Sequence, residues 1–122
     1  VKNHYFWIME SVRQSKVSKL LQKELAEIFR ANSKSMFDGA FITVTVVRIS
    51  TDLSSAKVYI SIMATKDVNE VYKIVTEKKI LIRKMLGNLI GKQVRIIPEL
   101  SFFIDDSYDY AEKINALFNK PI

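Results

Sequence analysis

Residues 56–64 carry the pattern that most limits the fold of this chain, in which Ala, Val or Ile occupies every second position. Successive side chains of a strand point to opposite faces, so this pattern predicts a strand with one buried face. The apolar set would lie inward and the other outward: Ala56, Val58, Ile60 and Ile62 against Lys57, Tyr59, Ser61 and Met63.

The segment before it, Phe41 to Ile49, is rich in β-branched residues and predicts another strand. The polar connection from Ser50 to Ser55 indicates an antiparallel hairpin between the two strands. Such a hairpin is not stable alone and needs helices over its apolar face. The expected faces of the first strand are Ile42, Val44 and Val46 on one side and Thr43, Thr45 and Val47 on the other.

Two segments predict those helices. From about Ser11 to Ala31, apolar residues recur at three- and four-residue spacing. A longer helix is expected from Asp67, placed as an N-cap with Glu70 three residues on as in a capping box, to about residue 90. Its apolar stripe weakens at residues 77–79, which leaves a bend or a break open, and Gly91 is expected to end it in a left-handed conformation.

A third strand is predicted at Val94 to Ile97, because Pro98 cannot donate to a ladder and weakens pairing beyond it. An extended apolar segment at residues 100–104 and a last short helix through about Asn119 would follow. The order α-β-β-α-β with a short C-terminal helix predicts an α+β domain, a small three-stranded sheet with helices on one face. That order matches the K-homology domain of the second type.

One domain is expected at residues 9–122, because Met9 has the look of a natural start. Residues 1–8 would then be an N-terminal extension or a cloning remnant, although Phe6 and Trp7 packing on the domain is the alternative. No apolar run approaches the roughly 18–20 residues needed to span a bilayer.

Charge is unevenly distributed along the chain. Basic residues outnumber acidic ones by 17 to 8 through Pro98, whereas 5 acidic residues oppose 2 basic ones from Glu99 onward. A basic body favours a polyanionic partner, and nucleic acid is the commonest of these. A merely soluble basic protein is the alternative on charge alone.

Catalytic groups are scarce. The chain has no Cys and a single His, His4, so thiolate chemistry is excluded and a zinc site would need carboxylates alone. Asp105 and Asp106 are adjacent, which points them to opposite faces of an extended segment, and capping of the following helix is the better account of them. With no phosphate-binding glycine loop either, the sequence predicts a protein that is not an enzyme and holds no metal or cofactor.

Basic side chains predict where RNA would bind. Lys78, Lys79, Arg83 and Lys84 cluster within seven residues, and Lys92 and Arg95 follow, so the long helix and third strand are expected to form one trough for a phosphate backbone. A solvated helix face is the alternative. Weaker candidates, for which that alternative is stronger, are Lys16, Lys19 and Lys23 on the first helix and Arg48 beside the hairpin turn.

The outer face of the second strand is a further candidate. Tyr59 and Met63 alternate there with Lys57. An aromatic side chain on a sheet can stack on a base, although ordinary packing is the more common role. The same face supports the alternative function, a K-homology-like protein-interaction module without direct RNA binding.

Several segments together resemble the ribosome-binding factor A family. They are the stretch Ser50 to Ser61, the stretch Pro98 to Asp105, and Arg83 with the Leu86-Gly87 step. The resemblance covers about Ser11 to Phe118 and implies a K-homology domain of the second type without a G-x-x-G loop, which this sequence indeed lacks. The family's helix–kink–helix carries Ala-x-Gly, where this chain has Lys78-Lys79-Ile80.

The resemblance also implies a function. Family members bind the free small (30S) ribosomal subunit, assist its late maturation and the processing of the rRNA 5′ end, and are linked to growth in the cold. The expectation is therefore a cytoplasmic, monomeric, non-catalytic assembly factor whose partners are small-subunit rRNA and, in addition, small-subunit proteins.

Overall fold

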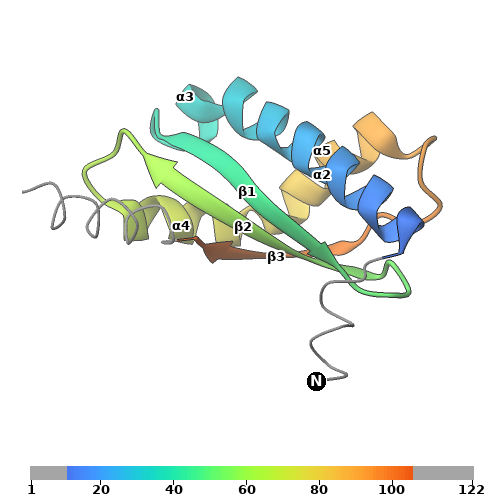
Figure 1. Ribbon diagram of the computed structural model, residues 1–122. Coiled ribbons are helices and arrows are strands. Elements are labelled where there is room, and N and C mark those ends of the chain that lie inside the picture. Colours follow the sequence, from blue (N-terminus) through green and yellow to red (C-terminus); the bar gives the residue numbers. More distant parts are fainter. Residues whose placement is uncertain (1–10, 106–122) are drawn as a thin grey trace, which may run out of the picture.

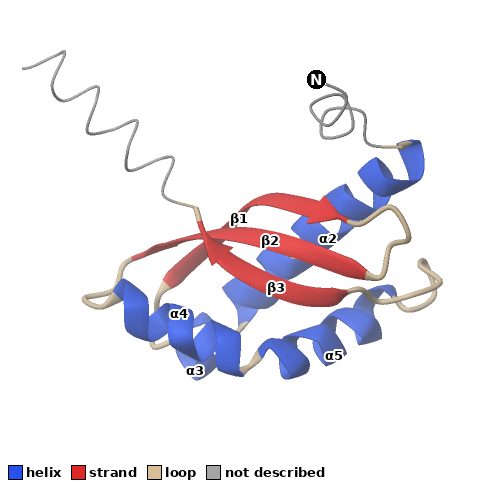
Figure 2. Cartoon of the chain, turned by 90° about the horizontal axis from the view of Figure 1, so that it is seen from below, coloured by secondary structure: helices blue, strands red, loops and turns tan. Residues whose placement is uncertain are grey.

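A computed structural model describes residues 11–105 and shows an α+β fold, which confirms the predicted class (Figure 1). Its three-stranded sheet has the order β1-β2-β3, with β1 antiparallel to β2 and β2 parallel to β3. Helices cover one face of the sheet (Figure 2). The elements are α2 (Val12–Ala31), α3 (Ser33–Met36), β1 (Phe41–Ile49), β2 (Ser55–Met63), α4 (Val68–Glu77), α5 (Lys79–Ile90) and β3 (Glu99–Ile104). Residues 1–8 and the predicted C-terminal helix lie outside the described residues.

The hairpin of β1 and β2 forms as predicted, but the first strand changes phase partway along. The register shifts between Val44 and Val46, so that Val47 is buried and Val46 is exposed. The predicted faces of these two residues were therefore wrong. A β-bulge adds one residue to a strand and moves the later side chains to the opposite face, which simple alternation does not reveal.

The third strand lies farther along the chain than the sequence indicated. Residues 94–97 form an irregular connection, and β3 begins at Glu99, whose N–H donates to Ser54 O at 2.9 Å. The prediction of a strand at Val94 to Ile97 was wrong. Pairing that starts after Pro98 buries Leu100 and Phe102 on the helix-covered face, a larger apolar contact than the earlier segment offers.

The first predicted helix is confirmed and is well capped. The Ser11 hydroxyl accepts from Gln14 N, and the Gln14 side chain accepts from Ser11 N, which completes a capping box. Gln14 Nε2 also donates to Ile49 O at 3.0 Å. The start of α2 is thereby fixed over the end of β1.

The long helix is broken at Lys78, which has φ −97° and ψ 12° and separates α4 from α5. Asp67 caps α4 as predicted, by accepting from Glu70 N at 3.1 Å. The predicted capping box is not formed, because Asp67 N donates to Thr65 Oγ1 and not to the Glu70 side chain. Gly91 follows α5 but is right-handed, so the left-handed ending was wrong. A Cβ there would lie 2.6 Å from Gly87 O, so a close backbone approach explains this glycine.

An aromatic cluster joins the helices to the sheet. Phe29 of α2 meets Phe37 edge-on at 5.4 Å between ring centroids and Phe102 of β3 at 5.9 Å. The core around it combines α2, both halves of the broken helix and all three strands, as Leu21, Leu25, Ile42, Val58, Ile60, Val71, Ile82, Leu86, Ile90 and Leu100 show by their burial.

Candidate RNA-binding surfaces

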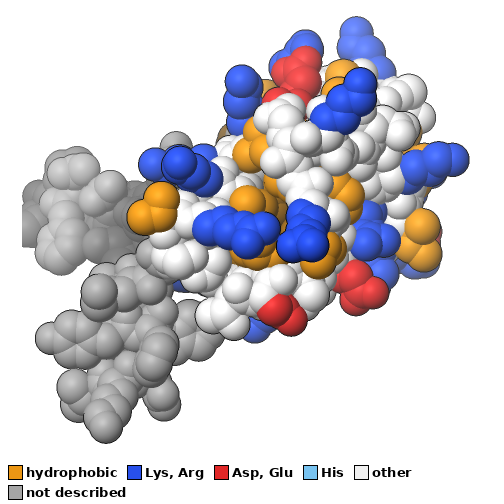
Figure 3. Space-filling view, turned by 90° about the vertical axis from the view of Figure 1, so that its right-hand side faces the viewer, with side chains coloured by type: hydrophobic (Ala, Val, Ile, Leu, Met, Phe, Trp, Pro, Cys, Tyr) orange, Lys and Arg blue, Asp and Glu red, His pale blue; other side chains and the backbone are white. Residues whose placement is uncertain are grey.

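A groove lies at the end of the molecule where α2 begins. Its volume is about 450 Å³, and α2, the β1–β2 turn and the α5–β3 connection all contribute to it. Figure 3 looks onto this end and shows Lys and Arg side chains around apolar ones. We call this the end groove; its lining residues are Val12, Arg13, Lys16, Val17, Leu53, Gln93, Val94, Arg95 and Ile96.

The three cations of the end groove come from two distant parts of the sequence. Arg13 and Lys16 are three residues apart near the start of α2, so they project from one side of the helix. Arg95 comes from the α5–β3 connection, which turns directly after α5 because Gln93 N and Val94 N both donate to Ile90 O. Among residues 11–105, no carboxylate lines this groove.

A smaller cavity of about 220 Å³ continues past Arg13 and Arg95 toward Asp52. Hydrogen bonds from the Ser54 hydroxyl, the Ser50 hydroxyl and Ser54 N lower the pKa of the Asp52 carboxyl to about 2. Asp52 is therefore ionised at neutral pH and its charge is used to hold the hairpin turn. Asp52 lines this smaller cavity but not the end groove.

The predicted trough along the broken helix is divided into two groups. Lys78 and Lys79 lie where α5 begins, whereas Lys92 follows its end. Twelve helical residues span about 18 Å, so the two groups are separated by roughly that distance. Lys79 and Lys84 are exposed and Lys78 is half-buried.

Arg83 has a contact that the sequence did not reveal. Its Nε donates to Pro98 O at 3.1 Å and its Nη2 donates to Ile97 O at 2.7 Å. The guanidinium thus holds the α5–β3 connection against α5 just before β3 begins. Its predicted role toward RNA stays a prediction.

The remaining candidates lie on other parts of the surface. Lys19 and Lys23 are exposed on α2 but do not line the end groove. Lys92 is exposed in the α5–β3 connection, just before the segment that lines the groove. Arg48 is exposed on β1 and lies opposite Lys57 in the sheet register.

Arg13 is the one cation of the end groove that was not predicted from the sequence as an RNA-binding residue. Arg13 is three residues before Lys16, so the sequence could have placed it on the same side of the first helix. Nothing in the sequence indicated that this side of the helix lies near Arg95. The structure brings together Lys16 and Arg95, which were expected on separate surfaces.

Two kinds of feature are absent from the described residues. Within residues 11–105 there is no group of three or more His, Cys, Asp or Glu side chains that could hold a metal ion. In the same range no helix is long and apolar enough to cross a membrane. The fold and these surfaces define a class, the small basic α+β domains whose exposed cations suit a polyanion.

Comparisons with known proteins place the chain within that class. Residues 13–118 match the family described as "Ribosome-binding factor A". A ribosome-binding factor A from Cytophaga hutchinsonii is 49% identical over 112 residues, which cover 92% of this chain and 84% of the relative. The chain belongs to the ribosome-binding factor A family.

Solved structures show the same fold. The crystal structure of ribosome-binding factor A from Thermus thermophilus superposes with a TM-score of 0.61 at 22% identity, over 75% of this chain and 94% of that one. A homology model of the Thermus thermophilus factor, fitted into a cryo-EM map of a complex with the 30S subunit, gives a TM-score of 0.59 at 19% identity, over 80% of this chain and 97% of that one.

Proposed function

We propose that this chain binds the free small (30S) ribosomal subunit through its rRNA and assists late maturation without catalysing a reaction. Membership of the ribosome-binding factor A family supports this, as does the relative fitted into a 30S complex. The proposal extends to processing of the rRNA 5′ end, a cytoplasmic location, action as a monomer and a role in growth in the cold. It treats residues 9–122 as one domain.

The observation that carries the proposed RNA contact is the end groove. Three cations from two parts of the chain line this groove, and no carboxylate among the described residues does so. The apolar residues of the groove could contact a ribose or a base while the cations contact the phosphates. Each phosphate neutralised by Lys or Arg releases counterions, so the contact would weaken as salt is added.

Co-sedimentation with purified 30S subunits tests this contact. Replacing Arg13, Lys16 and Arg95 together with Glu is expected to remove most of the binding. The matched control reverses three exposed lysines outside the groove, Lys34, Lys66 and Lys73, and is expected to bind nearly as wild type. Equal losses in both variants would overturn the placement of the RNA.

The candidates at the other end of α5 need a separate variant, with Lys78, Lys79 and Lys84 changed to Glu. Arg83 is left unchanged because its loss would disturb the α5–β3 connection. Weaker binding would extend the RNA path along α5, and unchanged binding would show that the RNA does not follow α5. The alternative function, a protein-interaction module without RNA binding, predicts affinity that changes little with salt.

A further inference from the structure

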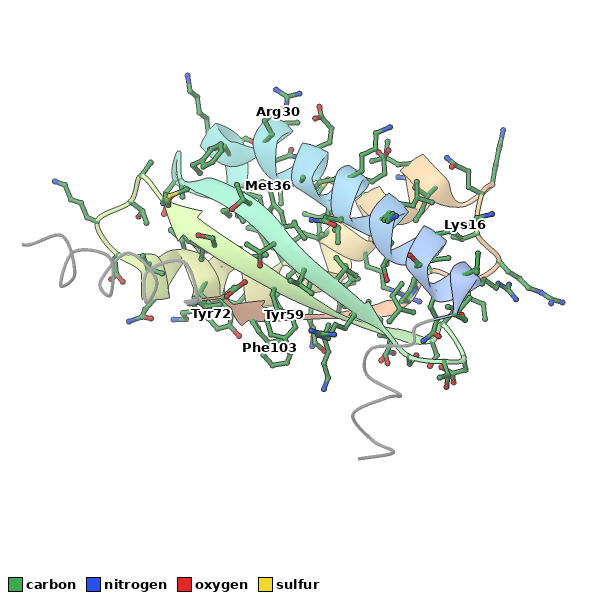
Figure 4. All side chains as sticks on the ribbon, viewed as in Figure 1. Lys16, Arg30, Met36, Tyr59, Tyr72 and Phe103 are labelled. Carbon is green, nitrogen blue, oxygen red and sulfur yellow. The ribbon has the colours of Figure 1, made fainter. Side chains whose placement is uncertain are left out.

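The sheet face opposite the helices carries an aromatic pair. No element within residues 11–105 covers this face (Figure 2). Tyr59 of β2 and Phe103 of β3 are register partners, and their rings stack with centroids 5.4 Å apart and planes inclined by 29°. Figure 4 shows both side chains on the side of the sheet away from α2. Phe103 is 39% exposed and belongs to an edge strand, so the side of its ring away from Tyr59 lies at the sheet edge.

A pair of cations lies beside the aromatic pair. Arg48 of β1 and Lys57 of β2 are register partners, and both are exposed. Like charges directly opposite one another destabilise a sheet. No ion pair within residues 11–105 includes either side chain; Arg30 and Glu27 form the one found there. A bound anion would relieve the repulsion between Arg48 and Lys57.

The distance along the sheet between the pair of cations and the aromatic pair suits a nucleotide. Lys57 and Tyr59 are two residues apart on β2, which corresponds to roughly 7 Å along a strand. Ser101 of β3 is the register partner of Lys57 and lies beside the cation pair, and the register places no carboxylate opposite Lys57 or Tyr59. Glu99 lies two residues beyond the cations on the side away from the rings, opposite Ser55. Asp105, at the end of β3, accepts from Thr45 Oγ1 at 2.6 Å.

We propose that this face, defined by Arg48, Lys57, Tyr59 and Phe103, binds unpaired nucleotides of RNA. The aromatic pair stacks on a base while the cation pair contacts the adjoining phosphate. Bases within a duplex are already stacked on one another, so aromatic side chains select single-stranded segments. The assignment to RNA rests on the proposed function, but the surface is separate from the end groove.

Binding of a fluorescein-labelled short oligouridine, followed by fluorescence anisotropy with the full chain, tests the proposal. The variant Tyr59→Leu/Phe103→Leu keeps apolar side chains but removes the stacking surfaces. It is expected to bind the oligouridine about 5- to 150-fold more weakly, the range for loss of one stacked base. Tyr59→Phe/Phe103→Tyr keeps two rings and is expected to bind as wild type.

Two controls separate stacking from general effects. Phe41 is an exposed aromatic residue at the start of β1, and Phe41→Leu is expected to leave binding unchanged. A duplex RNA of the same length is expected to bind wild type and Tyr59→Leu/Phe103→Leu equally. Unfolding curves of every variant verify that the fold is retained.

The outcomes distinguish this proposal from the function proposed above. Wild-type protein that binds 30S subunits but not the oligouridine would overturn the sheet-face proposal alone, and would point to a protein or to the chain's own residues beyond Asp105 as the occupant. Equal oligouridine affinity of wild type and Tyr59→Leu/Phe103→Leu would also overturn it. Oligouridine binding that depends on the aromatic pair, without binding to 30S subunits, would support the sheet face and contradict the proposed function.

Discussion

Arg83 should contribute more to stability than any other exposed cation of α5. Replacing Arg83 with Met keeps most of the aliphatic stem but removes the hydrogen bonds to Ile97 O and Pro98 O. Hydrogen bonds that involve a charged group contribute about 1.5–3 kcal/mol. Because the guanidinium is partly in water, we expect that range for the two bonds together, and a fall in Tm of about 6–12 °C for a domain of this size.

Urea and thermal unfolding curves measure this loss directly. The matched control is Lys84→Met, which removes the neighbouring charge from an exposed position without a hydrogen bond to the connection, and should stay within about 0.5 kcal/mol of wild type. Arg83→Met should also weaken 30S binding indirectly, because Arg95 lies on the connection that Arg83 holds. Equal stability of Arg83→Met and Lys84→Met would refute the structural role of Arg83.

The end groove, the hairpin turn and the end of α5 each give one further prediction. Changing the three end-groove cations to Gln should reduce the slope of log affinity for RNA against log salt by about 2–3, which a salt titration measures, and an unchanged slope would show that they contact no phosphates. Asp52 has its pKa lowered from 3.8 to about 2, so its stabilising contribution is present above about pH 4 and is lost as the pH falls through 2. The Tm difference between wild type and Asp52→Asn should therefore shrink on acidification, and a difference independent of pH would contradict this. Gly91→Ala should lower the free energy of unfolding by about 1–3 kcal/mol, because its Cβ would approach Gly87 O, and an unaltered urea midpoint would argue against that close approach.

Local patterns in the sequence were sufficient for most elements. The alternation at residues 56–64 and the helical spacing before Ala31 each reflect one buried face, and both elements form where expected. The bulge after Val44 and the position of β3 were missed because they depend on pairing between strands distant in sequence. Nothing near Val94 indicates that Phe102 will pack on Phe29.

The candidate site shows the same limit. The sequence indicated most of the basic residues as candidates for RNA binding, but it grouped together only those that are close in sequence. The fold instead places Lys79 and Lys92 at opposite ends of α5 and brings Arg95 to Lys16. The contact of Arg83 with Ile97 O is equally invisible in the sequence, because it depends on where the chain returns after α5.

The most direct test of the central claim is ultraviolet crosslinking of the full chain to purified 30S subunits, with the adducts mapped on both partners. We predict adducts between rRNA and the segments that line the end groove, residues 12–17 and 93–96. Adducts confined to ribosomal proteins, or to rRNA contacts around Lys66 and Lys73 on α4 and the turn before it, would contradict it.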